Sequence, residues 1–392
     1  MKRLIRKSHF DNVNSMRFLA FLGIFASHAI ISFDQQIRVS TLFSDVRQFT
    51  ANLQSASYSL LFILTGFLNT WSIFEERFIY KKMNVLRFFM RRVLGIIPLY
   101  IIAFLLGNYI LPLFNKGIPA AEEPAIHPLS YFSFSFNYSY SETWNPLVGA
   151  MGNMWSIAVT LQFLLLWPFL MRFFRRQEST LFVVLLGLYA AATWFFRDSP
   201  AWEFSVLRYI PEFVAGAFVA YISFFKYPSY QQLKENTRRT VGFTYLCFFV
   251  YLVMRNKLLN QIPEFPEYII LGLEHCIIAA TLAYFLFEQN FASNSVLKLA
   301  KLKFMEFPGK ISYGLYVYMT LGIVVAFATG NFLGDGESLL QVIVVRPLIA
   351  LIVTFVIAAF SHEYLEKKFL RRKKNYNPTR EYNPVNLNDA KT

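Results

Sequence analysis

The sequence predicts an all-α polytopic membrane protein with about ten transmembrane helices and both termini in the cytoplasm. Of the 392 residues, 55% are apolar and only 16% are charged, whereas soluble domains are about 45–50% apolar and about 25% charged. Apolar stretches near the roughly 20-residue length that crosses a bilayer recur along the chain. Lys and Arg gather in the short segments between these stretches, and each stretch should be helical because lipid cannot satisfy an open backbone.

The apolar stretches define ten spans, which we place in chain order at residues 15–33, 55–74, 93–114, 153–171, 180–196, 205–225, 240–256, 267–287, 311–333 and 338–361. With the N-terminus inside, 30 of the 38 Lys and Arg residues fall in segments predicted to be cytoplasmic, as the positive-inside rule requires. No small-residue cleavage pattern follows the first span, so we expect it to be retained. Residues 1–370 then form one membrane domain, and residues 371–392 form a basic tail that we expect to be disordered.

The formal net charge of +14 does not indicate a nucleic-acid-binding protein. The basic residues are divided among short segments between spans, whereas a nucleic-acid site needs one continuous soluble face. Cys247 and Cys276 lie inside apolar stretches, without the spacing of a disulfide framework or a metal site. We therefore expect membrane lipids as partners, and neither nucleic acid nor a bound metal.

Arg17 and His28 on the first span are the clearest pair of ionisable residues. Eleven residues at 100° each bring both side chains to one helix face, about 16 Å apart along the axis. A buried His acts as a general base near neutral pH, and an Arg at the cytoplasmic edge binds phosphate. Taken alone, the pair is better explained by an Arg that snorkels to head groups and a His that packs between helices.

Further polar residues within the spans allow functional and structural interpretations. Arg208 and Glu212 are four residues apart and can form an ion pair on the sixth span. Glu274 and His275 are adjacent, so their side chains diverge by 100° and cannot both face one substrate atom. Gln162 fits an interhelical hydrogen bond better than a catalytic role.

The segment from residue 80 to residue 92 mixes basic and apolar residues just before the third span, and it includes Arg87, Arg91 and Arg92. Such a segment binds the phosphates of coenzyme A or the head groups of anionic lipids. The residues alone do not decide between these two ligands.

Six motifs, in order, provide wider context for these residues. They are Arg-x10-His at residues 17–28, Leu-Thr-Gly-Phe at 64–67, Arg-Arg-Val-Leu-Gly at 91–95, Met-Trp-Ser-Ile at 154–157, Ile-Ser-Tyr-Gly at 311–314 and Tyr-Leu-Glu-Lys at 364–367. In this order, and with a ten-span layout, the chain resembles the acyltransferase-3 family of integral-membrane O-acyltransferases over roughly residues 12–370.

The resemblance implies transfer of an acyl group, most often acetyl, from a cytoplasmic coenzyme A thioester to a hydroxyl of an extracytoplasmic glycan. It implies that His28 is the catalytic residue, and that Arg17 and Arg92, helped by Arg87 or Arg91, hold the phosphates of acetyl-coenzyme A. It places further residues around the cavity: Trp155, Ser156, Gln162, Glu274 and Tyr313. The richness in Phe, Tyr and Asn favours a bacterial origin, and hence the bacterial cytoplasmic membrane.

The sequence departs from the family pattern at several positions. Gly95 stands where a second arginine often follows Arg92, Thr160 where a glutamate is usual, and Met319 where a histidine is common. Thr65 replaces the serine before Gly-Phe, and Lys368 replaces a proline. Either Glu274 or His275 is a candidate to replace the missing carboxylate. Two alternatives to an enzyme therefore stay open: a transporter on the same scaffold, and a structural component of polysaccharide export or assembly.

Overall fold

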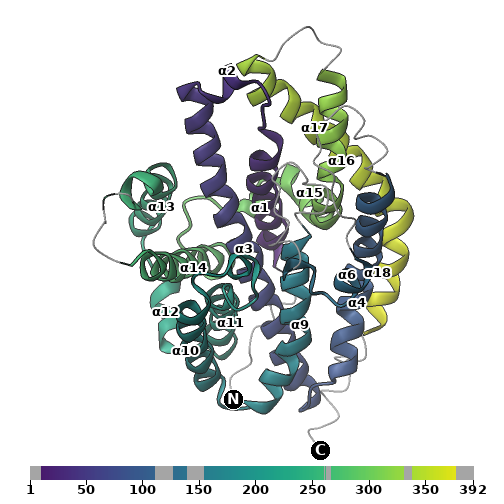
Figure 1. The fold of residues 1–392 in the computed structure, drawn as a ribbon. Helices are drawn as coiled ribbons and strands as arrows, with labels where there is room; N and C mark the ends of the chain where they lie inside the picture. Colours follow the sequence, from purple (N-terminus) through teal and green to yellow (C-terminus); the bar gives the residue numbers. More distant parts are fainter. Residues whose placement is uncertain are drawn as a thin grey trace, which may run out of the picture.

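The computed structural model describes residues 10–110, 127–138, 154–259, 261, 266–330 and 338–376. Their regular secondary structure is entirely helical, and Figure 1 shows its arrangement. The longer helices are α1 (Asp11–Ala29), α3 (Thr41–Tyr80), α4 (Val85–Leu105), α9 (Trp155–Phe173), α10 (Glu178–Phe196), α11 (Ile210–Phe225), α13 (Arg238–Leu259), α14 (Glu267–Phe291), α16 (Ser312–Gly330) and α17 (Arg346–Ser361). The shorter ones include α2 (Gln35–Arg38), α6 (Pro128–Phe132), η2 (Pro200–Phe204), α12 (Pro228–Lys234), α15 (Glu306–Lys310) and α18 (Lys367–Lys373).

Each of the ten predicted spans overlaps one of the ten longer helices. Seven helices are long and apolar enough to cross a membrane: α3, α4 with its π-helical extension to Ile110, α9, α10, α14, α16, and the continuous run from Gln341 to Lys373 that contains α17. The prediction of a polytopic all-α membrane protein is therefore confirmed. Helices α1, α11 and α13 coincide with the other three predicted spans. The cytoplasmic placement of both termini stays a prediction.

Helix α3 is 40 residues long and begins 14 residues before the predicted second span. Ser40 starts it, because its hydroxyl accepts a hydrogen bond from the Phe43 amide at 3.3 Å. Hydropathy locates only the apolar part of such a helix, so the polar first turns were missed. Helix α3 contacts α1, α9, α11, α13 and α14. In Figure 1, α10 to α14 lie on one side of α1 and α3, and α4, α16, α17 and α18 lie on the other.

Helices α3 and α11 touch backbone to backbone at two glycines. A Cβ on Gly66 would lie 2.2 Å from the carbonyl oxygen of Phe213, and one on Gly216 would lie 2.0 Å from that of Ile63. Small residues allow this approach, which is how helices associate in lipid without a hydrophobic driving force between them. The two glycines therefore set the short distance between α3 and α11.

The end of the chain stays helical past residue 370, where we placed the start of the tail. Helix α18 continues to Lys373, and a 3₁₀ turn covers Lys374–Tyr376. Arg91 on α4 donates a hydrogen bond to the backbone carbonyl of Tyr376 at 2.9 Å, which ties this turn to α4. The rest of the predicted tail lies outside the described residues.

We expect Gly216→Ala to lower the free energy of unfolding by about 1–3 kcal/mol, because the added methyl group overlaps the backbone of α3. Thermal unfolding of the purified protein in detergent measures the change. The matched control is Gly187→Ala on α10, where a Cβ meets nothing within 4 Å and the better helix propensity of Ala is stabilising by about 0.5–1 kcal/mol. Equal melting temperatures for the two variants would contradict the close approach.

Candidate active site

The described helices enclose a cavity of about 310 Å³. Each of the six motif-bearing segments contributes a residue to its wall: Arg17 from α1, Thr65 from α3, Arg92 from α4, Ser156 from α9, Tyr313 from α16, and Glu366 from the end of the π-helix η6 (His362–Glu366), just before α18. With the exception of α9, these residues lie near helix ends, or in helix halves, that the predicted topology places toward the cytoplasm. Two of the departures from the family pattern, Gly95 and Thr160, line the same cavity.

The charge of the cavity wall is strongly unbalanced. Five cations line it and only one carboxylate, that of Glu366, faces them; the cations are Arg17, Arg91, Arg92, Lys310 and Lys373. The charges of Arg17, Arg91 and Arg92 also act on one another and on that of Lys373. Like charges at this spacing raise the energy of the protein alone, so the cavity is suited to an anionic ligand.

Two of these cations are paired: Lys310 forms an exposed ion pair with Glu306 at 2.6 Å, and Arg91 forms a buried one. Nη2 of Arg91 lies 2.9 Å from Oε2 of Glu76, and both side chains are almost fully buried, with 4% and 2% exposed. The other carboxylate oxygen of Glu76, Oε1, accepts a hydrogen bond from the backbone N–H of Asn84 at 2.8 Å. Arg91 is thus neutralised by a bond that joins the end of α3 to the start of α4. Its main role is structural, although it also lines the cavity.

Arg17, Arg92 and Lys373 make no hydrogen bond and no ion pair with any residue that the structure describes. Arg92 lies over the ring of Phe88, 5.4 Å from its centre, and its Nε is buried without a partner among the described residues. A buried guanidinium with unused donors is costly unless a ligand satisfies it. These three unpaired cations are the groups of the cavity that can hold phosphate.

Lys373 occupies the space beside Gly95. A Cβ on Gly95 would lie 3.1 Å from Nζ of Lys373. The departure at Gly95 therefore coincides with a cation that comes from the far end of the chain. Our sequence analysis missed this residue because it assigned residues after 370 to the tail, and no local pattern connects residue 373 with residue 95.

Neutral polar residues complete the wall. The hydroxyls of Ser156 and Tyr316 are hydrogen-bonded at 2.7 Å, and the hydroxyl of Tyr313 donates to the carbonyl of Ile96 at 3.1 Å. Both Ser156 and Tyr313 line the cavity, where the sequence placed them. Trp155 points elsewhere: its ring packs against Tyr58, with centroids 4.9 Å apart, and against Tyr209 at 5.5 Å.

His28 does not line the cavity, but it faces α3. Its Nε2 is 2.8 Å from the amide nitrogen of Gln54, whose oxygen accepts from Ser27 at 2.9 Å. Because that amide nitrogen only donates, Nε2 of His28 carries the lone pair that can take a proton. Arg47 on α3 also binds the end of α1, donating to the carbonyls of Ser27 at 2.5 Å and Ile30 at 3.1 Å.

One face of α3 connects His28 with the cavity. Gln54, Tyr58 and Phe62 recur every fourth residue and so share this face. Gln54 binds His28, while Phe62 belongs to the cavity wall. Gln54 and Phe62 are eight positions apart in sequence, which corresponds to about 12 Å along the helix axis. The same-face placement of Arg17 and His28 on α1 is thus matched by a parallel row of side chains on α3.

Besides His28 and Trp155, three further predicted site residues lie away from this cavity. Glu274 forms an ion pair with Arg255 on α13, at 2.5 Å and 2.7 Å, and accepts a hydrogen bond from Tyr251. Gln162 donates to the carbonyl of Phe134 at 2.6 Å and to Asn137 at 2.8 Å, so it makes a structural link. Arg87 is half-buried near the start of α4 and is not part of the cavity wall.

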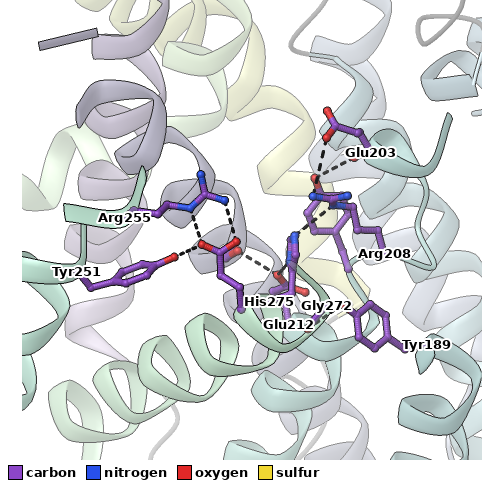
Figure 2. A network of polar contacts seen from close by, with 11 residues as sticks. Tyr189, Glu203, Arg208, Glu212, Tyr251, Arg255, Gly272 and His275 are labelled. Atoms are coloured by element: carbon purple, nitrogen blue, oxygen red, sulfur yellow. Dashed lines mark hydrogen bonds and ion pairs between the residues drawn. The ribbon is translucent and has the colours of Figure 1, made fainter. Parts of the chain in front are cut away.

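Arg208 and Glu212 do not pair directly, because His275 lies between them (Figure 2). The adjacent residues Glu274 and His275 face different helices, as their 100° separation predicts. Glu274 faces α13, and His275 contacts Glu212 on α11. No group of three or more His, Cys, Asp or Glu side chains among the described residues is placed to bind a metal ion.

The fold and the cavity define a polytopic membrane protein with a cation-lined site, and sequence comparison assigns it to a family. The sequence profile described as an acyltransferase domain matches residues 10–362, so the chain belongs to the acyltransferase-3 family. It is similar to O-acetyltransferase OatA of Staphylococcus aureus strains NCTC 8325 and COL, with 23% identity over 330 residues, covering 80% of this chain and 52% of each relative. The chain thus spans about half the length of the curated relatives it matches. No solved structure shows a significant match.

We expect Glu76→Ala to lower the free energy of unfolding by about 3–5 kcal/mol, because it leaves the buried charge of Arg91 uncompensated. Chemical denaturation in detergent measures the loss. The control is Glu363→Ala, which removes the partner of Lys367 in an exposed ion pair, where solvent screening makes the expected loss much smaller. Similar losses in both variants would show that Arg91 does not depend on Glu76.

Proposed function

We propose that the protein is a membrane O-acyltransferase that moves an acyl group, most often acetyl, from coenzyme A to a hydroxyl of an extracytoplasmic glycan. The observation that carries this proposal is the cavity, in which three cations without partners among the described residues meet at helix ends predicted to be cytoplasmic. Family membership supports the reaction class. The similarity to O-acetyltransferase OatA supports acetyl as the group transferred.

Arg17, Arg92 and Lys373 form the binding site for the acyl donor, and we call the cavity that they line the donor cavity. Coenzyme A carries a pyrophosphate and a third phosphate, and guanidinium and ammonium groups are the side chains that bind such oxygens most strongly. Arg91 contributes charge to the wall while its own hydrogen bonds go to protein groups. The narrow, largely apolar remainder of the cavity, with Phe21, Phe62 and Leu64 in its wall, suits the pantetheine arm.

His28 carries out the chemistry in one of two ways that the sequence left open. As a general base, it takes the proton of the acceptor hydroxyl while the hydroxyl oxygen bonds to the thioester carbonyl carbon; the carbon–sulfur bond then breaks, and the proton passes to the departing thiolate. As an acyl carrier, its nitrogen first displaces the thiolate and the acceptor oxygen then displaces the imidazole. The lone pair on Nε2 serves either route.

The glycan acceptor and the bacterial cytoplasmic membrane are parts of the same proposal. The similar Staphylococcus aureus proteins are named O-acetyltransferases, which supports a bacterial origin and a hydroxyl as the acceptor group. A donor cavity at the predicted cytoplasmic ends and a histidine in the predicted outer half of α1 support an arrangement with the two reactants on opposite sides of the bilayer. This arrangement requires the acyl group, but not coenzyme A, to cross.

We expect His28→Ala to lower acetyl transfer by about 10²–10⁴-fold, the usual contribution of a general acid–base residue, and to leave coenzyme A affinity unchanged. The assay follows loss of acetyl-coenzyme A and gain of ester-linked acetate in proteoliposomes. The control is His127→Ala, since His127 is exposed. Intact transfer by His28→Ala would rule out the assigned role.

The same assay separates the remaining alternatives. Radiolabelled acetate retained on the protein when no acceptor is present, and lost in His28→Ala, identifies the carrier route, whereas no retained label identifies the base route. Movement of a glycan across the membrane without consumption of the thioester would favour the transporter instead.

We expect Arg92→Ala and Lys373→Ala each to weaken binding of coenzyme A by roughly 10–100-fold, because each removes a charged partner of a phosphate. Titration calorimetry of the purified protein measures this affinity. Binding of pantetheine, which has no phosphate, should not change. The control is Arg371→Ala, since Arg371 is on the same helix but is exposed and does not line the cavity. Equal effects of Lys373→Ala on both ligands would contradict a phosphate contact.

A further inference from the structure

A second cavity, of about 360 Å³, lies at a different set of helix ends and shares no residue with the donor cavity. Its wall is formed by the last turns of α10, by the segment 198–208 that includes η2, and by the first turns of α14. The predicted topology places these ends on the outer side. Its size lies within the range of about 300–1,000 Å³ that is usual for small-molecule sites.

The charges that line this second cavity are balanced, whereas those that line the donor cavity are mostly positive. Two cations, Arg197 and Arg208, are matched by Asp198 and Glu203, with contacts at 3.4 Å and 4.0 Å. Aromatic rings supply much of the remaining wall: Tyr189 and Trp202 are stacked at 6.3 Å, and Tyr268 lies 5.2 Å from the guanidinium of Arg197. Balanced donors and acceptors beside rings suit a neutral ligand rich in hydroxyl groups, not a polyphosphate.

Arg208 is the residue best placed to bind such a ligand. Its Nε donates to Nε2 of His275 at 3.1 Å, and its Nη2 is 4.0 Å from Glu203, beyond hydrogen-bond distance. Four of its five N–H donors are therefore unused among the described residues, although its side chain is only 16% exposed. Arg208 lines the cavity, so these unused donors are available to oxygens of a ligand there.

A buried network fixes Arg208 in position (Figure 2). Because the guanidinium can only donate, Nε2 of His275 must accept, and its Nδ1–H donates to Glu212 at 2.9 Å. Glu212 is fully buried and also accepts from Ser59 on α3 at 3.0 Å. The neutral imidazole thus links Arg208 to the buried carboxylate of Glu212, and this link fixes the orientation of the guanidinium group.

One side chain separates the two cavities. The ring of Tyr209, next to Arg208 in sequence, lies 5.9 Å from the ring of His275 and 4.6 Å from that of Phe62. His275 lines the second cavity and Phe62 lines the donor cavity. The second cavity is therefore separated from the donor cavity by one layer of aromatic side chains.

We propose that this second cavity binds the acceptor, a neutral polyhydroxylated ligand such as a glycan sugar unit, and that Arg208 donates to its oxygens. The inference rests on the proposed function, since an acceptor exists only if acyl transfer occurs. It assigns Arg208 as a binding residue and His275 and Glu212 as positioning residues.

The test compares Arg208→Gln with a matched control in the neighbouring network. Arg255 pairs with Glu274, the residue beside His275, but it lines neither cavity (Figure 2). Each substitution removes an arginine from a polar network that includes a buried carboxylate: Arg255 pairs with Glu274 directly, and Arg208 is linked to Glu212 through His275. Two quantities are measured: ester-linked acetate released by mild alkali from the surface glycans of cells that produce each full-length variant, and the affinity of each purified variant for coenzyme A.

We expect Arg208→Gln to lower ester-linked acetate at least tenfold while its coenzyme A affinity stays within twofold of the wild type. Arg255→Gln should leave both quantities within twofold. Should Arg208→Gln fail to accumulate, Arg208→Lys and Arg255→Lys, which keep the charge but lose the planar fork, take their places with the same expectations.

Three results would overturn the assignment: unchanged acetate in Arg208→Gln, equal loss of acetate in both variants, or an equal loss of coenzyme A affinity. A wild-type protein that binds coenzyme A but adds no ester-linked acetate overturns the proposed function itself, and the acceptor assignment with it.

Discussion

The close packing of α3 against α1 and α11 is the constraint on which the rest of the structure depends. Backbones meet at Gly66 and Gly216, and Gly23 on α1 approaches the side chain of Ser57 just as closely. Without side chains at these points, α3 carries Gln54 to His28 and Phe62 to the donor cavity. In lipid, where burying apolar surface adds little, such contacts determine helix positions. Both cavities are therefore defined relative to one helix.

Electrostatics then distinguishes structural from functional charges within this frame. Arg91 and Arg255 are balanced by carboxylates that are themselves buried, which is the condition for keeping charges away from water, and Arg208 is linked to the buried Glu212 through His275. Arg17, Arg92 and Lys373 lack such a balance among the described residues. An unbalanced cluster of cations lowers stability, so its presence requires a benefit of another kind. In the proposed function, a bound polyphosphate provides that benefit, because the ligand supplies the missing negative charge.

Periodicity and hydropathy were sufficient to predict the helices, because lipid leaves the backbone no alternative. Helical geometry also predicted that Arg17 and His28 share a face and that Glu274 and His275 diverge. What local rules could not predict was contact between distant segments. His275 enters between Arg208 and Glu212 from 63 residues beyond the latter, and Lys373 reaches Gly95 from the other end of the chain. The polar start of α3 was missed for a simpler reason, since hydropathy does not register amphipathic helix outside the membrane.

The separation of the two cavities by Tyr209 follows from the problem that a transmembrane acyl transfer has to solve. A thioester open to both aqueous phases would be lost to water, and a continuous channel would let small solutes leak across the membrane. The rings of Phe62, Trp155 and Tyr209 pack against one another and form an apolar layer, which disfavours water. Gln54, which is hydrogen-bonded to His28, is one helical turn from Tyr58 on α3. The ring of Tyr58 packs against Trp155 of this layer. On the proposed mechanism, the reacting hydroxyl, the carbonyl carbon and the base meet at this layer, because it lies between the two cavities.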